Sequence, residues 1–194
     1  MRWELLEREE LYGGFFRLER YTLRYQRYDG GWNGPLQREM FERGHAVAVL
    51  PYDPVRDAVV LIEQFRPGAL EAPGGPWMTE IVAGMIDAGE RAEDVARREG
   101  VEEAGLVFEK LMPITRYWVS PGGTTESIVL YCGLIDSTGA GGLHGLVEEH
   151  EDIRVSVVSR AEAMARVEDG SICSAAPIIA LQWLALNRER LAAL

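Results

Sequence analysis

The sequence predicts an α/β fold: an α/β/α sandwich around a mixed sheet, with a separate strand element at the N-terminal end. Two continuous apolar runs, at 46–51 and 58–63, indicate buried strands joined by a hairpin, because strands covered on both faces lack polar alternation. Helical patterns follow at 91–104 and near the C-terminal end. Strands that alternate with a few helices are typical of a layered α/β domain.

Residues 1–43 are predicted to form the strand element, and residues 44–194 the main domain. Aromatic and arginine residues alternate loosely over 15–27, which favours a strand, and a turn signal at 28–31 leads to a return strand at 36–43. This element lacks an apolar core of its own. Because exposed strand edges invite pairing, we expect it to form a homodimer.

Further elements follow in order along the main domain. Strands are expected at 77–83, 114–119, 127–134 and 153–158. A helix begins at Ser159, with Glu162 placed to complete a capping box. The last helix, at about 176–192, is apolar on most faces and is therefore expected to be buried.

Composition limits the possible partners and compartments. The 194 residues are 47% apolar, which suits one compact domain with a small appended element. A net charge of −11 argues against nucleic acid or an anionic membrane as a partner. No apolar stretch approaches about 20 residues, so we expect neither a signal peptide nor a membrane span. Cys132 and Cys173 are too few for a disulfide framework, which predicts reduced cysteines and a cytoplasmic protein.

Three glutamates on the 91–104 helix carry the strongest chemical signal. Glu99, Glu102 and Glu103 stand at i, i+3 and i+4, so they share one face, and no lysine lies among them. Like charges at i, i+4 destabilise a helix by about 0.2–0.5 kcal/mol per pair. A divalent cation such as Mg²⁺, which takes oxygen ligands, would reverse that sign. The strip therefore predicts an open metal site, with a solvated acidic face as the alternative.

The surrounding residues extend the signal over 84–106. The whole set resembles the Nudix box, a glycine-led loop and helix that binds diphosphates through divalent metal: Gly84, Glu90, Arg98, Glu99, Glu102, Glu103 and Gly105. Gly100 departs from the family pattern, which usually has an aliphatic residue there. A glycine inside a helix costs up to about 1 kcal/mol relative to alanine, but this one removes no ligand.

The chain is similar over nearly its whole length to the bacterial ADP-ribose pyrophosphatase branch of the Nudix superfamily, from the Gly13-Gly14-Phe15-Phe16 segment onward. The resemblance makes residues 44–194 a Nudix hydrolase domain. It implies hydrolysis of ADP-ribose to AMP and ribose 5-phosphate, with Mg²⁺ or another divalent cation such as Mn²⁺ as cofactor.

The same resemblance assigns the catalytic centre. It implies metal ligation by the carbonyl of Ala83 and by the carboxylates of Glu99, Glu103 and Glu151. It makes Glu149 the catalytic base, with its neighbour Glu148 as a competitor for that role. The supporting residues are Gly84, Glu90, Arg98 and Glu102, with Arg98 expected to pair with Glu90 or another acid.

Substrate contacts are implied in the N-terminal strand element and in the main domain. Phe15 and Phe16 match residues that flank adenine, and Arg38 and Arg66 match arginines that contact the nucleotide. Aromatic and guanidinium planes stack well on a purine. The 120–126 turn offers amides and hydroxyls to a diphosphate or ribose. Its implied substrate-binding residues are Ser120, Gly122 and Glu126.

Two other functions stay open. Because the box reads only diphosphate and metal, the substrate could be another nucleoside diphosphate sugar such as GDP-mannose. The chain could also be a sensor that binds ADP-ribose without cutting it. Glu99, Glu103 and Glu149 argue against a sensor, since a pure binder needs no base.

Overall fold

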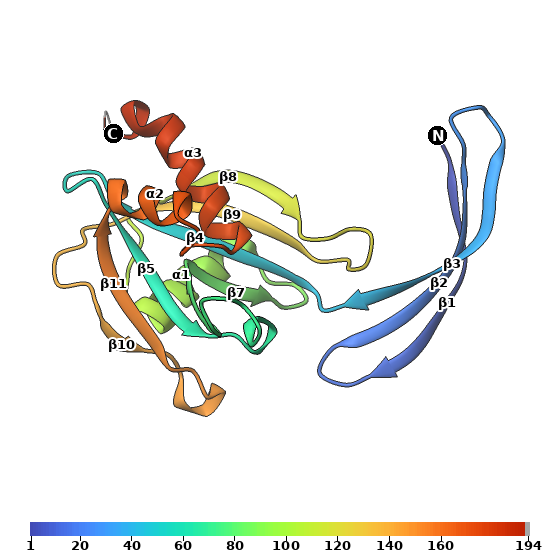
Figure 1. The fold of residues 1–194 in the computed structure, drawn as a ribbon, viewed down its shortest axis with the longest axis horizontal. Helices are drawn as coiled ribbons and strands as arrows, with labels where there is room; N and C mark the ends of the chain where they lie inside the picture. Colours follow the sequence, from blue (N-terminus) through green and yellow to red (C-terminus); the bar gives the residue numbers. More distant parts are fainter. Residues whose placement is uncertain (193–194) are drawn as a thin grey trace. The chain divides into compact units, whose positions relative to one another are not determined.

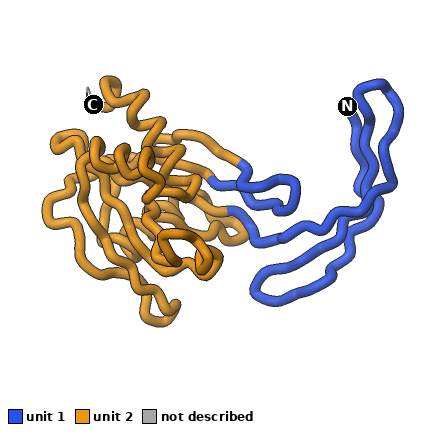
Figure 2. The backbone as a smooth tube through the Cα atoms, viewed as in Figure 1, with its two compact units in different colours: residues 1–45, 118–128 blue, residues 46–117, 129–194 orange. Residues whose placement is uncertain are grey.

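The computed structural model describes residues 1–192 and divides the chain into two compact units (Figure 2). Unit 1 comprises residues 1–45 together with 118–128, and unit 2 comprises residues 46–117 and 129–194. The 118–128 segment, which contains the expected substrate-binding turn, thus belongs to the same unit as the N-terminal strands.

Unit 1 contains a three-stranded antiparallel sheet in the order β1-β2-β3. Its strands are β1 (Trp3–Gly13), β2 (Arg17–Gln26) and β3 (Trp32–Glu42). Strand β1 was not predicted, because its run of charged residues hides any apolar alternation. Those charges pair across the strands at Arg24–Glu4, Arg20–Glu9 and Arg8–Glu19. Opposite charges on neighbouring strands stabilise a sheet by about 0.2–1 kcal/mol per pair, so the same residues support the strand that they conceal.

Unit 2 holds most of an eight-stranded sheet with the order β10-β11-β5-β4-β9-β8, plus β6 beside β5 and β7 beside β4 (Figure 1). The strands are β4 (His45–Asp53), β5 (Ala58–Phe65), β6 (Trp77–Glu80), β7 (Val82–Ile86), β8 (Lys110–Trp118), β9 (Ser127–Leu134), β10 (Gly142–His144) and β11 (Ile153–Ser159). The short β10 lies in a glycine-rich segment and was not predicted.

The neighbouring strands β4 and β5 separate soon after their hairpin. They pair at Tyr52↔Val59 and Asp53↔Ala58, and farther along β5 takes β6 as a partner while β4 takes β7. The strand expected at 77–83 is consequently wrong as one element. It is two strands, interrupted at the buried Ile81, because each part pairs with a different neighbour.

Helices cover both faces of the unit 2 sheet. They are α1 (Ala92–Ala104), α2 (Arg160–Glu168) and α3 (Ala175–Ala192), with short 3₁₀ turns at Pro67–Ala69 and Val147–Glu149. On β5, Val60 and Ile62 pack in one cluster with Val95 of α1. Val59 and Leu61, which point to the opposite face, are also fully buried. Figure 1 shows α2 and α3 on the side away from α1. The predicted α/β/α sandwich around a mixed sheet is confirmed.

The helix ends follow the sequence signals, but the burial of α3 does not. The hydroxyl of Ser159 accepts a hydrogen bond from the Glu162 amide at 3.1 Å, as the capping box predicts. In α3, Leu181 and Leu184 are fully buried, whereas Leu186 is 87% exposed. The expectation of a helix buried on most faces is therefore wrong, because one side alone of this apolar helix meets the core. No helix within residues 1–192 combines the length and hydropathy that a bilayer span requires.

Candidate active site

The acidic helix α1 is joined to strand β7 through its most deeply buried carboxylate. Glu103 is 2% exposed, and its Oε2 accepts a hydrogen bond from the backbone amide of Ala83 at 2.8 Å. That bond places the two predicted metal-binding residues side by side. It also satisfies one oxygen of a carboxylate that could not otherwise be buried at acceptable cost.

The first glycine of the box makes room for the second carboxylate. A Cβ atom on Gly84 would lie 2.1 Å from Oε1 of Glu99 and 2.3 Å from its Cδ. The carboxyl group of Glu99 therefore lies directly against the backbone of β7, which requires a residue without a side chain. This contact explains physically why the loop before the acidic helix begins with glycine.

The buried acids of this cluster hold their protons unusually tightly. Burial raises the pKa of Glu99 to about 7; Arg98 opposes the rise, and the negative charges of Glu102, Glu151 and Glu149 add to it. Burial raises the pKa of Glu103 to about 8, with Glu99 and Glu151 adding to it and the Ala83 amide opposing it. The structure therefore brings the carboxylates expected at the catalytic centre into one electrostatic environment.

The 145–152 loop is attached to the C-terminal half of α1. The amide of Gly145 donates a hydrogen bond to the carbonyl oxygen of Glu102 at 3.2 Å. Within the loop, the amide of Leu146 donates to Oε2 of Glu151 at 3.2 Å, and Glu149 is exposed at the end of a 3₁₀ turn. Glu149 is thus a solvent-accessible carboxylate held near the acidic helix, as a base that activates water would need to be.

The donor set suits a divalent cation, although the carboxylates are not gathered into a cage. Across residues 1–192, no three His, Cys, Asp or Glu side chains converge closely enough to hold an ion. Each of these three acids, the buried Glu103 and the partly buried Glu99 and Glu151, instead contacts a donor of the protein: Glu99 with Arg98, Glu103 with Ala83 and Glu151 with Leu146. All candidate ligands are oxygens, and their mutual repulsion adds to the effect of burial in raising the pKa values of Glu99 and Glu103. These residues therefore fit a hard cation such as Mg²⁺ by donor chemistry.

Arg98 links two acids of its own helix. Its Nη1 atom lies 2.9 Å from Oε1 of Glu99 and 2.9 Å from Oε2 of Glu102. Of the two partners expected for Arg98, Glu90 or another acid, the structure has the second. Glu90 instead accepts a hydrogen bond from the amide of Asp87 at 3.0 Å and closes the turn before the helix.

The unusual Gly100 is matched by an aromatic ring. A Cβ atom on Gly100 would lie 2.5 Å from Cε2 of Phe108, and one on Gly133 would lie 2.3 Å from Cδ1 of the same ring. Phe108 is 3% exposed and belongs to the core cluster of α1. Its ring therefore fills the volume that an aliphatic residue at position 100 would otherwise occupy.

Unit 1 contains the aromatic residues predicted to hold the purine. The rings of Phe15 and Phe16 lie edge to face with centroids 4.7 Å apart, and Phe15 is 93% exposed. The guanidinium of Arg43 lies 5.1 Å over the Phe16 ring and forms an ion pair of 3.5 Å with Glu126. The sequence analysis did not select Arg43, because nothing local in the sequence links it to either partner.

The predicted substrate turn is joined to β3 in the same unit. The amide of Phe41 donates to the carbonyl of Gly123 at 2.8 Å. Ser120 and Gly122 are exposed in this turn, whereas Glu126 is 6% exposed. Arg38 is exposed on β3, and its Nη1 donates a hydrogen bond to the neighbouring carbonyl of Gln37 at 2.7 Å.

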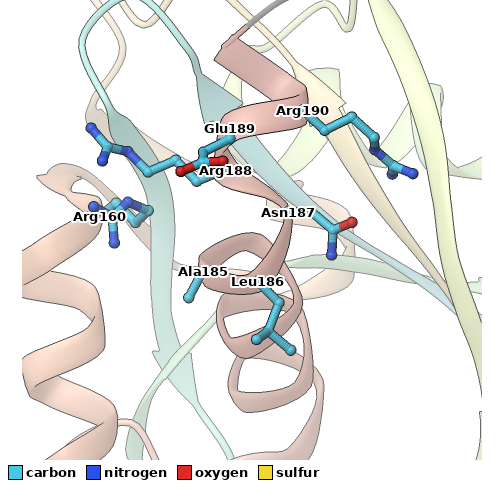
Figure 3. A pocket seen from close by; sticks show the side chains of 7 residues that line it. All are labelled: Arg160, Ala185, Leu186, Asn187, Arg188, Glu189 and Arg190. Atoms are coloured by element: carbon cyan, nitrogen blue, oxygen red, sulfur yellow. The ribbon is translucent and has the colours of Figure 1, made fainter.

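A separate open pocket lies beside α3 and contains none of the predicted site residues (Figure 3). It encloses about 680 Å³ and is lined by Arg160, Ala185, Leu186, Asn187, Arg188, Glu189 and Arg190. Arg160 and Arg188 both pair with the carboxylate of Asp57, at 2.9 and 3.3 Å. Their positive charge is therefore partly compensated within the fold by the one carboxylate of Asp57.

Comparison with known proteins assigns the chain to a family. A family model described as NUDIX domain matches residues 42–175. Curated proteins called ADP-ribose pyrophosphatase match from Escherichia coli (strain K12), 52% identical over 97% of this chain and 90% of the relative, and from Haemophilus influenzae, 44% identical over 97% and 88%. A GDP-mannose pyrophosphatase from Cronobacter sakazakii is 34% identical over 95% of both chains.

A solved structure described as an ADP compounds hydrolase has a TM-score of 0.75 and 20% identity, covering 100% of this chain and 98% of the other. At that identity the likeness concerns the fold alone. The family match and the relatives together give one conclusion: the chain belongs to the NUDIX family.

Proposed function

We propose that the chain is a hydrolase that uses a divalent cation to split the diphosphate of ADP-ribose into AMP and ribose 5-phosphate. The observation that carries this proposal is the 52% identity, over nearly the whole chain, to curated ADP-ribose pyrophosphatases. The clustering of Glu99, Glu103, Glu149 and Glu151 supports a catalytic rather than a purely binding role.

In this proposal the buried acids hold the metal and the loop supplies the base. The Ala83 carbonyl with Glu99, Glu103 and Glu151 would hold Mg²⁺, which when bound neutralises the diphosphate and polarises phosphorus. Glu149 takes a proton from a water molecule while the oxygen of that water forms a bond to one phosphorus. The bond from that phosphorus to the bridging oxygen breaks, and the two phosphates separate.

Glu149 is favoured over Glu148 as the base. The negative charge of Glu149 adds, after burial and the charges of Glu102 and Glu151, to the raised pKa of Glu99, which supports a place for Glu149 near the acidic helix. Arg98 and Glu102 act in support, because their ion pair keeps the helix face in register.

Unit 1, taken by itself, carries residues that we propose to contact a purine nucleotide. Phe15 offers an exposed ring to a purine, and the ion pair of Arg43 with Glu126 lies beside Phe16. Arg38, Ser120 and Gly122 are exposed and accessible to a ligand. Within unit 2 itself, we propose that Arg66 provides a cation for the diphosphate.

We further propose a homodimer formed through the N-terminal strands, in a cytoplasmic protein. Exposed apolar side chains on this sheet support a partner surface: Trp3, Leu5, Leu6, Tyr12 and Tyr25. Both cysteines are free in the structure, which suits a reducing compartment.

GDP-mannose is the second candidate substrate, because a GDP-mannose pyrophosphatase is 34% identical to this chain over most of the length of both. The deciding experiment measures phosphate-ester products by chromatography with ADP-ribose and GDP-mannose, each with Mg²⁺, with Mn²⁺ and with excess chelator. We expect AMP from ADP-ribose at a kcat/KM at least about 10-fold above that for GDP-mannose, a difference of about 1.4 kcal/mol. Tight binding of ADP-ribose without AMP release would instead indicate a sensor.

A further inference from the structure

A chain of three polar side chains lies where β5 meets β6. In this antiparallel pair Ile62 faces Glu80 and Gln64 faces Met78, so Gln64 and Glu80 belong to one face of the hairpin. The alternate residues, Phe65 and Trp77, face each other on the opposite side, with ring centroids 5.5 Å apart.

A single carboxylate oxygen receives both hydrogen bonds in this cluster. Oε2 of Glu80 accepts from Nε of Arg66 at 2.8 Å and from Nε2 of Gln64 at 3.3 Å. Gln64 is 7% exposed, and the Glu80 side chain is 18% exposed. The buried Gln64 amide thus holds the Glu80 carboxylate in place, and the carboxylate in turn holds the Arg66 guanidinium.

The contact uses the Nε edge of Arg66 and leaves its other edge available. Within residues 1–192, the only hydrogen bond of the Arg66 guanidinium is that of Nε, and neither terminal Nη atom makes one. A guanidinium carries five N–H donors in a rigid plane, so four of them remain for a ligand. The side chain is 43% exposed, and its positive charge acts on Glu103 of the acidic helix.

We propose that Glu80 is a positioning residue, which holds Arg66 so that its Nη atoms bind oxygens of the substrate diphosphate. This inference rests on the proposed hydrolysis of a nucleoside diphosphate sugar and names a residue that serves it. One edge of a guanidinium can donate two parallel hydrogen bonds to two phosphate oxygens. Because Glu80 holds the guanidinium plane before the substrate binds, less side-chain entropy is lost on binding.

A double-mutant cycle tests the inference. Kd for ADP is measured by calorimetry with Mg²⁺ for wild type, Glu80→Gln, Arg66→Met and the double variant, and KM and kcat are measured with ADP-ribose. We expect Glu80→Gln to weaken ADP binding by about 5- to 30-fold, the effect of losing one charged hydrogen bond. In the presence of Arg66→Met, Glu80→Gln should change Kd by less than about 2-fold. The loss should appear in KM more than in kcat.

Glu63→Gln is the matched control, because Glu63 is on the same strand but pairs with Arg154 on the other face of β5. It should leave Kd for ADP unchanged. Glu80→Gln with wild-type affinity, or with an equal effect whether residue 66 is arginine or methionine, would overturn the inference.

Arg66→Lys provides a second test if Glu80→Gln does not fold. A lysine keeps the charge but cannot contact Glu80 and a diphosphate through opposite edges, so its ADP affinity should fall nearly to that of Arg66→Met. Wild-type affinity in Arg66→Lys would contradict the inference. A wild-type enzyme that releases AMP but lacks the coupling refutes the inference alone, whereas one that neither binds ADP nor cuts ADP-ribose refutes the proposed function as well.

Discussion

At the scale of single residues, Glu103 is a buried acid whose neighbours are also acids. The Oε2 atom of Glu103 accepts a hydrogen bond from the Ala83 amide. Burial raises the pKa of Glu103, and the nearby charge of Glu99 adds to the rise. Divalent metal offsets such repulsion more effectively than solvent does in a buried site.

We therefore expect Glu103→Gln to remove nearly all activity, and Glu102→Gln to remove less, because Glu102 is more exposed and pairs with Arg98. Steady-state rates with Mg²⁺, together with Mn²⁺ binding measured by electron paramagnetic resonance, give the comparison. Full activity of the wild type in excess chelator would contradict a role for metal.

Glu149 and Glu148 allow binding to be separated from chemistry at adjacent positions. Glu149→Gln should keep the fold, the metal and ADP-ribose binding, since Glu149 is exposed and makes no core contact. Turnover should fall by about 10²–10⁴-fold, the usual contribution of a positioned base.

Glu148→Gln is the neighbouring control and should keep kcat near the wild-type value. Measurements of kcat and of ADP-ribose Kd at saturating Mg²⁺ distinguish the two. A large loss in Glu148→Gln with normal turnover in Glu149→Gln would move the base by one residue.

At the scale of elements, α1 carries a glycine whose cost is compensated by packing. Gly100 lies against the buried ring of Phe108, so alanine would improve helix propensity by about 1 kcal/mol but clash with the ring. Overpacking of a core costs about 1–3 kcal/mol.

We expect Gly100→Ala to lower the free energy of unfolding, and the addition of Phe108→Leu to restore part of it. Urea denaturation of both single variants and the double variant gives the coupling energy. Additive effects would indicate that the ring does not set the choice of glycine.

The β4–β5 hairpin is attached to the segment after β9 through Asp53, which is 1% exposed. Burial alone would raise the pKa of this carboxyl, but hydrogen bonds from Ser137 and Arg56 outweigh it and hold the pKa well below its usual range. A lowered native pKa means that its stabilisation is complete above about pH 4 and is lost as pH falls below the pKa of the unfolded chain.

Asp53→Asn should therefore cost about 2 kcal/mol at pH 7 and flatten the decline of stability below about pH 4. Thermal unfolding is measured from about pH 3 to about pH 7, a range that includes the pH at which aspartate titrates, and it reports both effects. Asp136→Asn, at an exposed carboxylate that also contacts Arg56, is the control and should change stability little. Equal pH profiles for wild type and Asp53→Asn would rule out this role.

At the scale of the whole molecule, the proposed dimer concerns unit 1. Its sheet exposes Trp3 at 74% and Tyr12 at 66%, which is costly for a surface without a partner. Sedimentation equilibrium should give twice the chain mass of 21.6 kDa at micromolar concentration. A stable monomer at that concentration would refute the proposed dimer.

The sequence by itself determined the features that depend on short spacing. The apolar runs of β4 and β5, the cap at Ser159 and the shared face of Glu99 and Glu103 follow from helix and strand periods, which are local properties of the chain. The spacing over 84–106 also pointed to the family that the comparisons support.

Tertiary structure alone decided the contacts between distant segments. The bond of Arg66 to Glu80 depends on the register of a hairpin, and the packing of Phe108 on Gly100 depends on how the sheet meets α1. The raised pKa of Glu103 requires burial that exists only once the core is assembled. Such effects depend on distances through space, which the order of residues specifies only through the complete fold.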